Sequence, residues 1–149
     1  MNTERQISAG GVIFRPSGGS IKVALISVKG GKVWALPKGL NEKGENLART
    51  AHREVKEETG LDGKILTKIG HINYFFMLKD EGETRRFFKI VYFFLMEYTG
   101  GSVEDHDEEV EECRWFNINE AIKLMKYEDE KEILKKAKKL IKELKGLAA

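Results

Sequence analysis

The pattern of apolar and polar positions along the chain predicts strands interrupted by helices. Apolar-rich runs bounded by turn residues predict strands over 6–14, 21–28, 34–36, 61–78, 84–98 and 113–116. Glycine-containing turns separate several of them, at 16–19, 30–31 and 80–83. The first two strands are therefore expected to form one hairpin, and the long pair around 80–83 is expected to form another.

Helical spacing replaces this pattern in three places. A helix is expected over 47–59, with Asn46 as its N-cap and Gly60 as a left-handed stop. A short helix capped by Asn119 follows the last strand, and a final helix covers 129–145. The apolar face of this final helix is expected to consist of Ile133, Ala137, Leu140, Ile141 and Leu144.

The order of these elements is strands, helix, strands, helices. It indicates an α/β protein with a mixed sheet and helices packed on its faces, and not the regular alternation of a doubly wound fold. The 149 residues are about one domain's worth, so residues 1–149 are expected to form a single domain that needs no disulfide to fold.

Composition narrows the class of protein further. A net charge of +2 does not mark the chain as a polyanion binder, and the lysines of the final helix flank an apolar stripe, so no nucleic-acid partner is expected. No apolar run approaches about 18 residues and no signal segment is visible, so no membrane contact is expected and the location is expected to be cytoplasmic. The single Cys113 excludes an internal disulfide and is expected to be a small buried hydrophobe.

The helix over 47–59 contains an arrangement that opposes helix stability. Glu54 and Glu58 are like charges at i and i+4, and Glu57 and Glu58 lie in the last turn, where the helix dipole favours cations. Local rules tend to be broken at functional sites. A hard dication such as Mg²⁺ takes oxygen ligands and would resolve the conflict, whereas the alternative is a solvated Glu/Lys face. Arg53 is expected to pair with Glu45 in the preceding loop, 38–45.

The segment that begins at Gly39 resembles the Nudix box. Gly39, Glu45 and the run 53–61 (Arg-Glu-Val-Lys-Glu-Glu-Thr-Gly-Leu) match it at every fixed position. The resemblance implies an α/β/α sandwich with a central mixed sheet, and a pyrophosphohydrolase that uses Mg²⁺ or Mn²⁺. It further implies that the metal is bound by Glu54, Glu57, Glu58 and the carbonyl of Lys38, and that Arg53 orients the carboxylates.

The general base varies among Nudix enzymes, so two candidates stay open. One is a box glutamate such as Glu54. The other is Glu109 in the acidic loop over 104–109, six residues before Trp115, where several relatives place a distal glutamate. The alternative for that loop is a solvated acidic turn.

The segment 34–39 resembles the diadenosine tetraphosphate hydrolase branch of the family. By this likeness Tyr74 stacks on a base, and Lys38 and Lys89 bind phosphates. The implied reaction splits diadenosine tetraphosphate into ATP and AMP. Tyr74 is equally compatible with a core position, and Lys89 with an exposed strand position.

Other functions compatible with the box stay open. One is a sanitising hydrolase of modified nucleoside triphosphates or of ADP-ribose. Another is a non-catalytic module that senses a nucleotide, although such modules usually lose box carboxylates and all are present here. The expected partner is in each case a small nucleotide, and the chain is expected to be a monomer or a homodimer.

Overall fold

A mixed seven-stranded sheet forms the centre of the computed structural model, which describes residues 2–28, 30 and 33–148. The strands are β1 (Thr3–Ser17), β2 (Ser20–Val28), β3 (Val33–Ala35), β4 (Lys38–Leu40), β5 (Leu61–Asp80), β6 (Glu83–Gly101) and β7 (Glu112–Asn117). The helices are α1 (Leu47–Thr59), the short 3-10 helix η1 (Val103–Asp105), α2 (Ile118–Leu124) and α3 (Glu128–Ala148). Gly31, half of the predicted turn at 30–31, lies outside the described residues.

Both predicted hairpins are present, and a parallel pair joins them. The strand order is β3-β2-β1-β6-β5, with β4 also paired to β1 and β7 to β2. β1 runs parallel to β6 from Thr3 opposite Arg86 to Phe14 opposite Glu97, while every other pairing is antiparallel. The sheet is therefore mixed, as the order of elements predicts.

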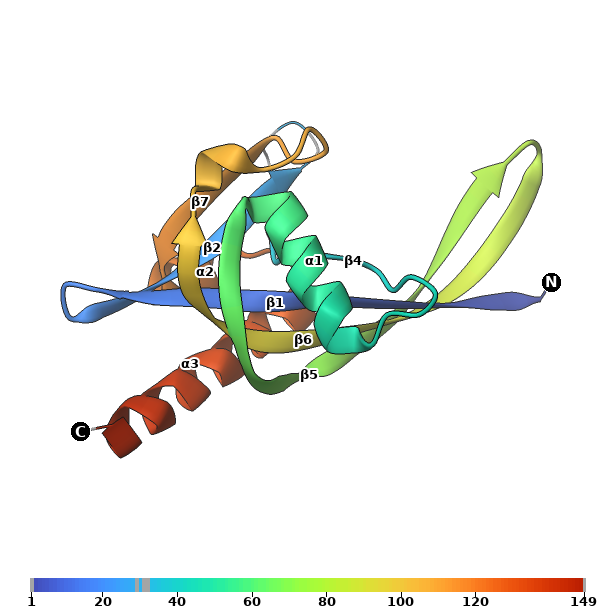
Figure 1. Cartoon of the computed structure of the whole chain (residues 1–149). Coiled ribbons are helices and arrows are strands. Elements are labelled where there is room, and N and C mark those ends of the chain that lie inside the picture. The colour runs from blue at the N-terminus through green and yellow to red at the C-terminus, as the bar shows by residue number, and fades with distance from the viewer. Residues whose placement is uncertain (1, 29, 31–32, 149) are drawn as a thin grey trace.

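Helices cover both faces of this sheet, with α1 on one side and α3 on the other (Figure 1). Successive residues of β1 point to opposite faces, so Ile13 packs in the cluster with Val55 of α1, whereas Val12 packs with Leu134 of α3. All four are fully buried. Burial on both faces explains why this part of β1 is a continuous apolar run, and it confirms the predicted α/β/α sandwich.

The caps of α1 are those that the sequence predicts. The side chain of Asn46 accepts a hydrogen bond from Arg49 N at 2.9 Å, and Gly60 adopts a left-handed conformation with φ 78°. The predicted cap of the next helix was wrong by two residues: Asn117 caps α2, and its side chain accepts from Asn119 N at 3.0 Å.

Two further predictions need correction. Residues 38–45 are not all loop, because β4 pairs with β1 at Gly10 opposite Lys38. This close approach needs a glycine, since a Cβ at Gly10 would overlap the carbonyl of Pro37. Leu144 is 40% exposed and does not belong to the buried face of α3. The C-terminal end of this helix extends past the sheet (Figure 1).

The far ends of β5 and β6 project from the sandwich as a two-stranded arm (Figure 1). Aromatic residues of β5 and β6 differ in exposure, with Phe87 and Phe93 buried and Phe75 exposed at 65%. None of the described helices is both long enough and apolar enough to cross a bilayer.

Candidate active site

Arg53 lies at the centre of the acidic cluster on α1. Its Nε and Nη2 donate to Glu45 at 2.7 and 2.9 Å, which confirms the predicted pair, and Nη2 also donates to the carbonyl of Leu40 at 3.0 Å. Its Nη1 donates to Glu54 at 2.6 Å and to Glu57 at 3.4 Å. This pairing holds the pKa of Glu45 at about 2, so one guanidinium ties the loop before the helix to the carboxylates on it.

Gly39 lets the Glu54 carboxylate lie against the backbone of β4. A Cβ at Gly39 would overlap that carboxylate, so a side chain other than hydrogen would displace Glu54. Burial raises the pKa of Glu54 above its ordinary value, and Glu57 raises it further, while Arg53 acts in the opposite direction.

Glu58 faces the same strand from the last turn of α1. Its Oε1 accepts a hydrogen bond from Lys38 N at 2.8 Å. Burial raises the pKa of Glu58 to about 7 despite this bond, because Glu54 and Asp107 add negative charge nearby. The positive charge near Glu58 is thus too small to offset its burial and the negative charge of its neighbours.

The three box glutamates do not converge on one point in this structure. Arg53 contacts Glu54 and Glu57, and the Lys38 amide holds Glu58. Among residues 2–28, 30 and 33–148, no group of three His, Cys, Asp or Glu side chains is placed to surround a metal ion. The three carboxylates nevertheless lie on one face of α1, because their positions in the helix are i, i+3 and i+4.

Glu130 on α3 is a site residue that sequence reasoning missed. Its side chain is 4% exposed, and its two oxygens accept from Leu36 N at 2.8 Å and from Lys38 Nζ at 2.9 Å. Burial lowers the pKa of Lys38, but the charge and hydrogen bond of Glu130 outweigh it, and the net pKa is raised. A glutamate in a Glu- and Lys-rich helix gives no local sign of such a contact.

A cavity of about 490 Å³ adjoins the Lys38–Glu130 pair. Tyr74 and Tyr127 line it together with Lys38, Ile72 and residues 128–130. Tyr74 is half-buried, packing on the core while it borders the cavity, so its two predicted roles are not exclusive.

Lys89 on β6 lies directly opposite Tyr74 on β5. Burial lowers its pKa, and the nearby charge of Lys38 lowers it further. Within the part of the chain that the structure describes, Lys89 forms no ion pair. Lys89 is therefore a half-buried cation near the box glutamates Glu54 and Glu58, and its strand neighbour Tyr74 lines the cavity.

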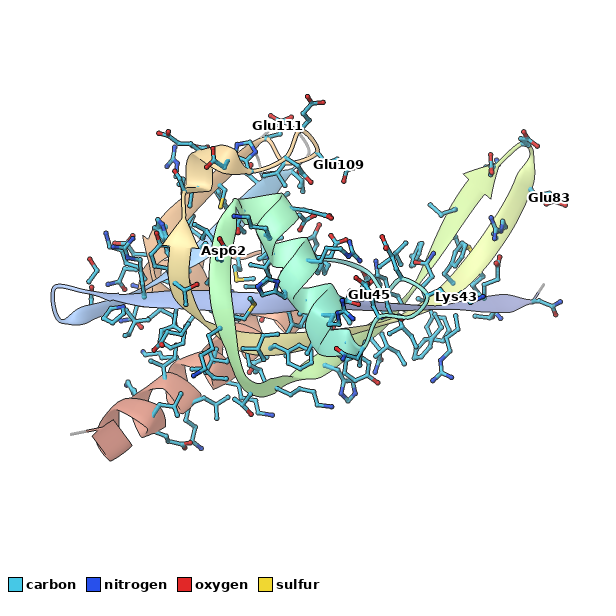
Figure 2. The ribbon with its side chains drawn as sticks, in the orientation of Figure 1. Lys43, Glu45, Asp62, Glu83, Glu109 and Glu111 are labelled. Atoms are coloured by element: carbon cyan, nitrogen blue, oxygen red, sulfur yellow. The ribbon has the colours of Figure 1, made fainter. Side chains whose placement is uncertain are left out.

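The acidic loop approaches α1 through Asp107. Asp107 N donates to the carbonyl of Glu57 at 2.8 Å, and its charge raises the pKa of both Glu54 and Glu58. One of its carboxylate oxygens is buried with no hydrogen-bond partner among the described residues. Glu109, the residue singled out from the sequence, is exposed in the loop beyond the C-terminal end of α1, whereas Glu45 lies at the other end (Figure 2).

Comparison with known proteins shows the family to which the chain belongs. The sequence model of the family described as NUDIX domain matches residues 4–137. The chain is 36% identical over 98% of its length to a Mycobacterium tuberculosis protein described as a mutator protein, MutT4, of which it spans 60%. It also matches a Mycolicibacterium smegmatis 8-oxo-(d)GTP phosphatase at 28% identity over 85% of its length, spanning 36% of that protein.

Another relative is a pig bis(5'-nucleosyl)-tetraphosphatase of the asymmetrical type, 34% identical over 68% of this chain and 67% of that protein. Among solved structures, a C. elegans Ap4A hydrolase aligns with a TM-score of 0.62 and 25% identity, over 91% of this chain and 98% of that one. The NUDIX domain of Shewanella oneidensis NrtR, solved with ADP ribose, aligns with a TM-score of 0.69 over 94% of this chain and 90% of that one. At 16% identity this last likeness shows the fold alone.

Proposed function

The chain belongs to the Nudix hydrolase family, and from that premise we propose that it hydrolyses a phosphoanhydride bond in a dinucleoside polyphosphate with the help of a divalent metal ion. Diadenosine tetraphosphate, split into ATP and AMP, is the proposed substrate. The relatives described as asymmetrical tetraphosphatases and as an Ap4A hydrolase support this choice.

One observation carries the proposal: the acidic face of α1 and the cavity of Tyr74 meet at Lys38. The amide of Lys38 holds Glu58, its side chain lines the cavity, and Lys89 lies opposite Tyr74 in the sheet. A ligand with a planar base and several phosphates is bound by an aromatic surface at the base and by cations and a carboxylate-held metal at the phosphates. The same order is found from Tyr74 through Lys38 to Glu58.

The residues present fit a hard dication. The donors are carboxylate oxygens with no sulfur or imidazole among them, which suits Mg²⁺ or Mn²⁺. Glu58 and Asp107 add independent support, because burial raises the pKa of Glu58 and a buried carboxylate oxygen of Asp107 has no hydrogen-bond partner among the described residues. We assign Glu54, Glu57, Glu58 and the Lys38 carbonyl as the groups that would hold the metal.

The residues of the site have different roles in this reaction. Bound metal would supply neutralisation of charge on the phosphate oxygens. Arg53 keeps the carboxylates oriented, while Lys38 and Lys89 bind phosphate groups and Tyr74 stacks on the base. For the general base we keep both Glu54, which lies within the cluster, and Glu109, which stands exposed on the neighbouring loop.

The test is a product analysis with a substrate panel. The purified protein is incubated with Mg²⁺ and diadenosine polyphosphates, 8-oxo-dGTP, unmodified nucleoside triphosphates or ADP-ribose, and the products are identified by chromatography. We expect ATP and AMP from diadenosine tetraphosphate with the highest kcat/KM of the panel. Tight nucleotide binding with no turnover of any compound would instead favour a sensing module.

A second candidate function rests on the two mycobacterial relatives. MutT4 and the 8-oxo-(d)GTP phosphatase point to hydrolysis of modified nucleoside triphosphates. Release of pyrophosphate from 8-oxo-dGTP, faster than any cleavage of diadenosine tetraphosphate, would establish this alternative.

A further inference from the structure

The carboxylate of Glu130 reaches from α3 to the segment that adjoins the acidic face of α1. A buried charge is costly unless it is paired and hydrogen-bonded. Here one oxygen accepts from the backbone of Leu36 at 2.8 Å and the other from the ammonium of Lys38 at 2.9 Å. Glu130 therefore fixes two points of the segment 36–38, which lies more than 90 residues earlier in the chain.

The same segment is held from the opposite side by α1. Glu58 accepts from the amide of Lys38 at 2.8 Å, and the carbonyl of Pro37 accepts from Gly11 N at 3.2 Å. Segment 36–38 is thus placed between Glu130 of α3 and Glu58 of α1. A shift of Lys38 alters the position of the amide that orients Glu58.

We propose that Glu130 is a positioning residue for the metal-binding carboxylates, acting through segment 36–38 on Glu58 and on the Lys38 carbonyl. This inference rests on the proposed function, since that function makes these groups metal ligands. Glu130 itself touches neither metal nor phosphate. Its role is to keep the Lys38 backbone at a fixed position while the cavity beside it fills and empties.

The experiment measures metal binding without substrate. Mn²⁺ affinity is determined by electron paramagnetic resonance for the wild type, Glu130→Ala, Glu130→Gln and the matched control Glu132→Gln. Glu132 lies on the same helix, but its side chain is 68% exposed and forms an ion pair only with Lys135 among the described residues. Amide hydrogen exchange at Leu36 and Lys38 is recorded on the same samples.

We expect a slowly exchanging Leu36 amide in the wild type, and faster exchange in Glu130→Ala. We expect Mn²⁺ binding to weaken about 10-fold in Glu130→Ala, as for the loss of other groups that orient metal ligands. Glu130→Gln keeps an acceptor for Leu36 but loses the charge facing Lys38, so its affinity should be intermediate. Glu132→Gln should match the wild type.

The metal dependence of activity distinguishes a positioning role of Glu130 from a purely structural one. Loss of stability alone lowers the active fraction, whereas mispositioned metal ligands raise the Mg²⁺ concentration that gives half of the maximal rate. Wild-type Mn²⁺ affinity in both Glu130 variants would overturn the proposal. If Glu130→Ala does not fold, the Mn²⁺ affinity of Glu130→Gln tests the proposal. If neither variant folds, rapid hydrogen exchange of the Leu36 amide in the wild type would overturn the proposal.

Failure of the proposed function has a different signature. A wild type that neither binds Mn²⁺ nor turns over any compound of the panel refutes the metal-dependent function, and with it the metal role of Glu130. A wild type that does both, together with Glu130 variants that bind Mn²⁺ normally, refutes only the role of Glu130.

Discussion

The carboxylate of Glu54 lies where the side chain of residue 39 would be, so Gly39 is required by the position of Glu54. The requirement is one of space and not of backbone conformation, because Gly39 belongs to β4 and its φ is not positive. Any other residue at position 39 would therefore require the Glu54 carboxylate to move aside.

Gly39→Ala should abolish metal-dependent activity while the protein stays folded. The added methyl displaces the Glu54 carboxylate, which breaks its contact with Arg53 and moves a proposed metal ligand. Gly100→Ala is the control, since a Cβ there meets no atom within 4 Å. Steady-state rates and circular dichroism of both variants check this, and full activity in Gly39→Ala would contradict the placement of Glu54.

Glu57→Gln should lower kcat by about 100-fold, the size of effect that follows removal of one electrostatic contact in a reactive site. The melting temperature should hardly change, because the side chain is 47% exposed and only its 3.4 Å contact with Arg53 is weakened. Rates at saturating Mg²⁺ and thermal melts test this, with the exposed Glu104→Gln as control. Undiminished activity would remove Glu57 from the metal site.

Arg53→Lys should destabilise the protein by about 1–3 kcal/mol, because lysine cannot reproduce the two-point contact with Glu45 and the further bonds to Leu40 and Glu54. Arg85→Lys provides the comparison: both side chains of its Glu4 pair are 46% exposed, so its loss of stability should be smaller than that of Arg53→Lys. Urea unfolding measures both, and equal losses would argue against Arg53 as the centre of the cluster.

The raised pKa of Glu58 predicts a pH dependence of stability in metal-free buffer. Because burial raises this pKa from 4.5 to about 7, the folded protein binds the proton more tightly than the unfolded chain does. The contribution of protonated Glu58 to stability is complete below pH 4.5 and is lost as the pH rises through 7.

The stability of Glu58→Gln relative to the wild type should therefore increase as the pH rises between these two values. Above the higher value the difference should reach about 1–2 kcal/mol, after allowance for partial exposure of the side chain. Urea unfolding in EDTA at several pH values measures the difference. Saturating Mg²⁺ should raise the wild-type melting temperature more at pH 8 than at pH 6, since metal binding requires the ionised carboxylate. A difference between the two proteins that is independent of pH would contradict the shifted pKa.

Tyr74→Leu should raise KM for diadenosine tetraphosphate by about 10-fold or more, because base stacking on an aromatic contributes roughly 1–3 kcal/mol. Its effect on kcat should be smaller. Phe75→Leu is the matched control, since Phe75 is the neighbouring aromatic, is 65% exposed and points to the other face of β5. An unchanged KM in Tyr74→Leu would remove the stacking role.

Much of the acidic face of α1 is determined by local sequence. Asn46 and Gly60 set the ends of the helix because their preferences act within one turn of the chain. Spacing of three and four residues places Glu54, Glu57 and Glu58 on one face, and Arg53 reaches Glu45 only eight residues away. The alternating and continuous apolar runs likewise determine which segments are strands.

Contacts between distant segments depended on the tertiary structure. Glu130 meets Leu36 because α3 packs against the face of the sheet on which Leu36 is buried, a position that no local pattern specifies. Among the hydrogen bonds between described residues, the one from the acidic loop to α1 comes from the amide of Asp107 and not from Glu109, and it is accepted by the carbonyl of Glu57. The sequence by itself determined which residues carry charge along each helix and strand. The tertiary structure decided which of those charges meet, because sheet register and helix packing bring together side chains that are far apart along the chain.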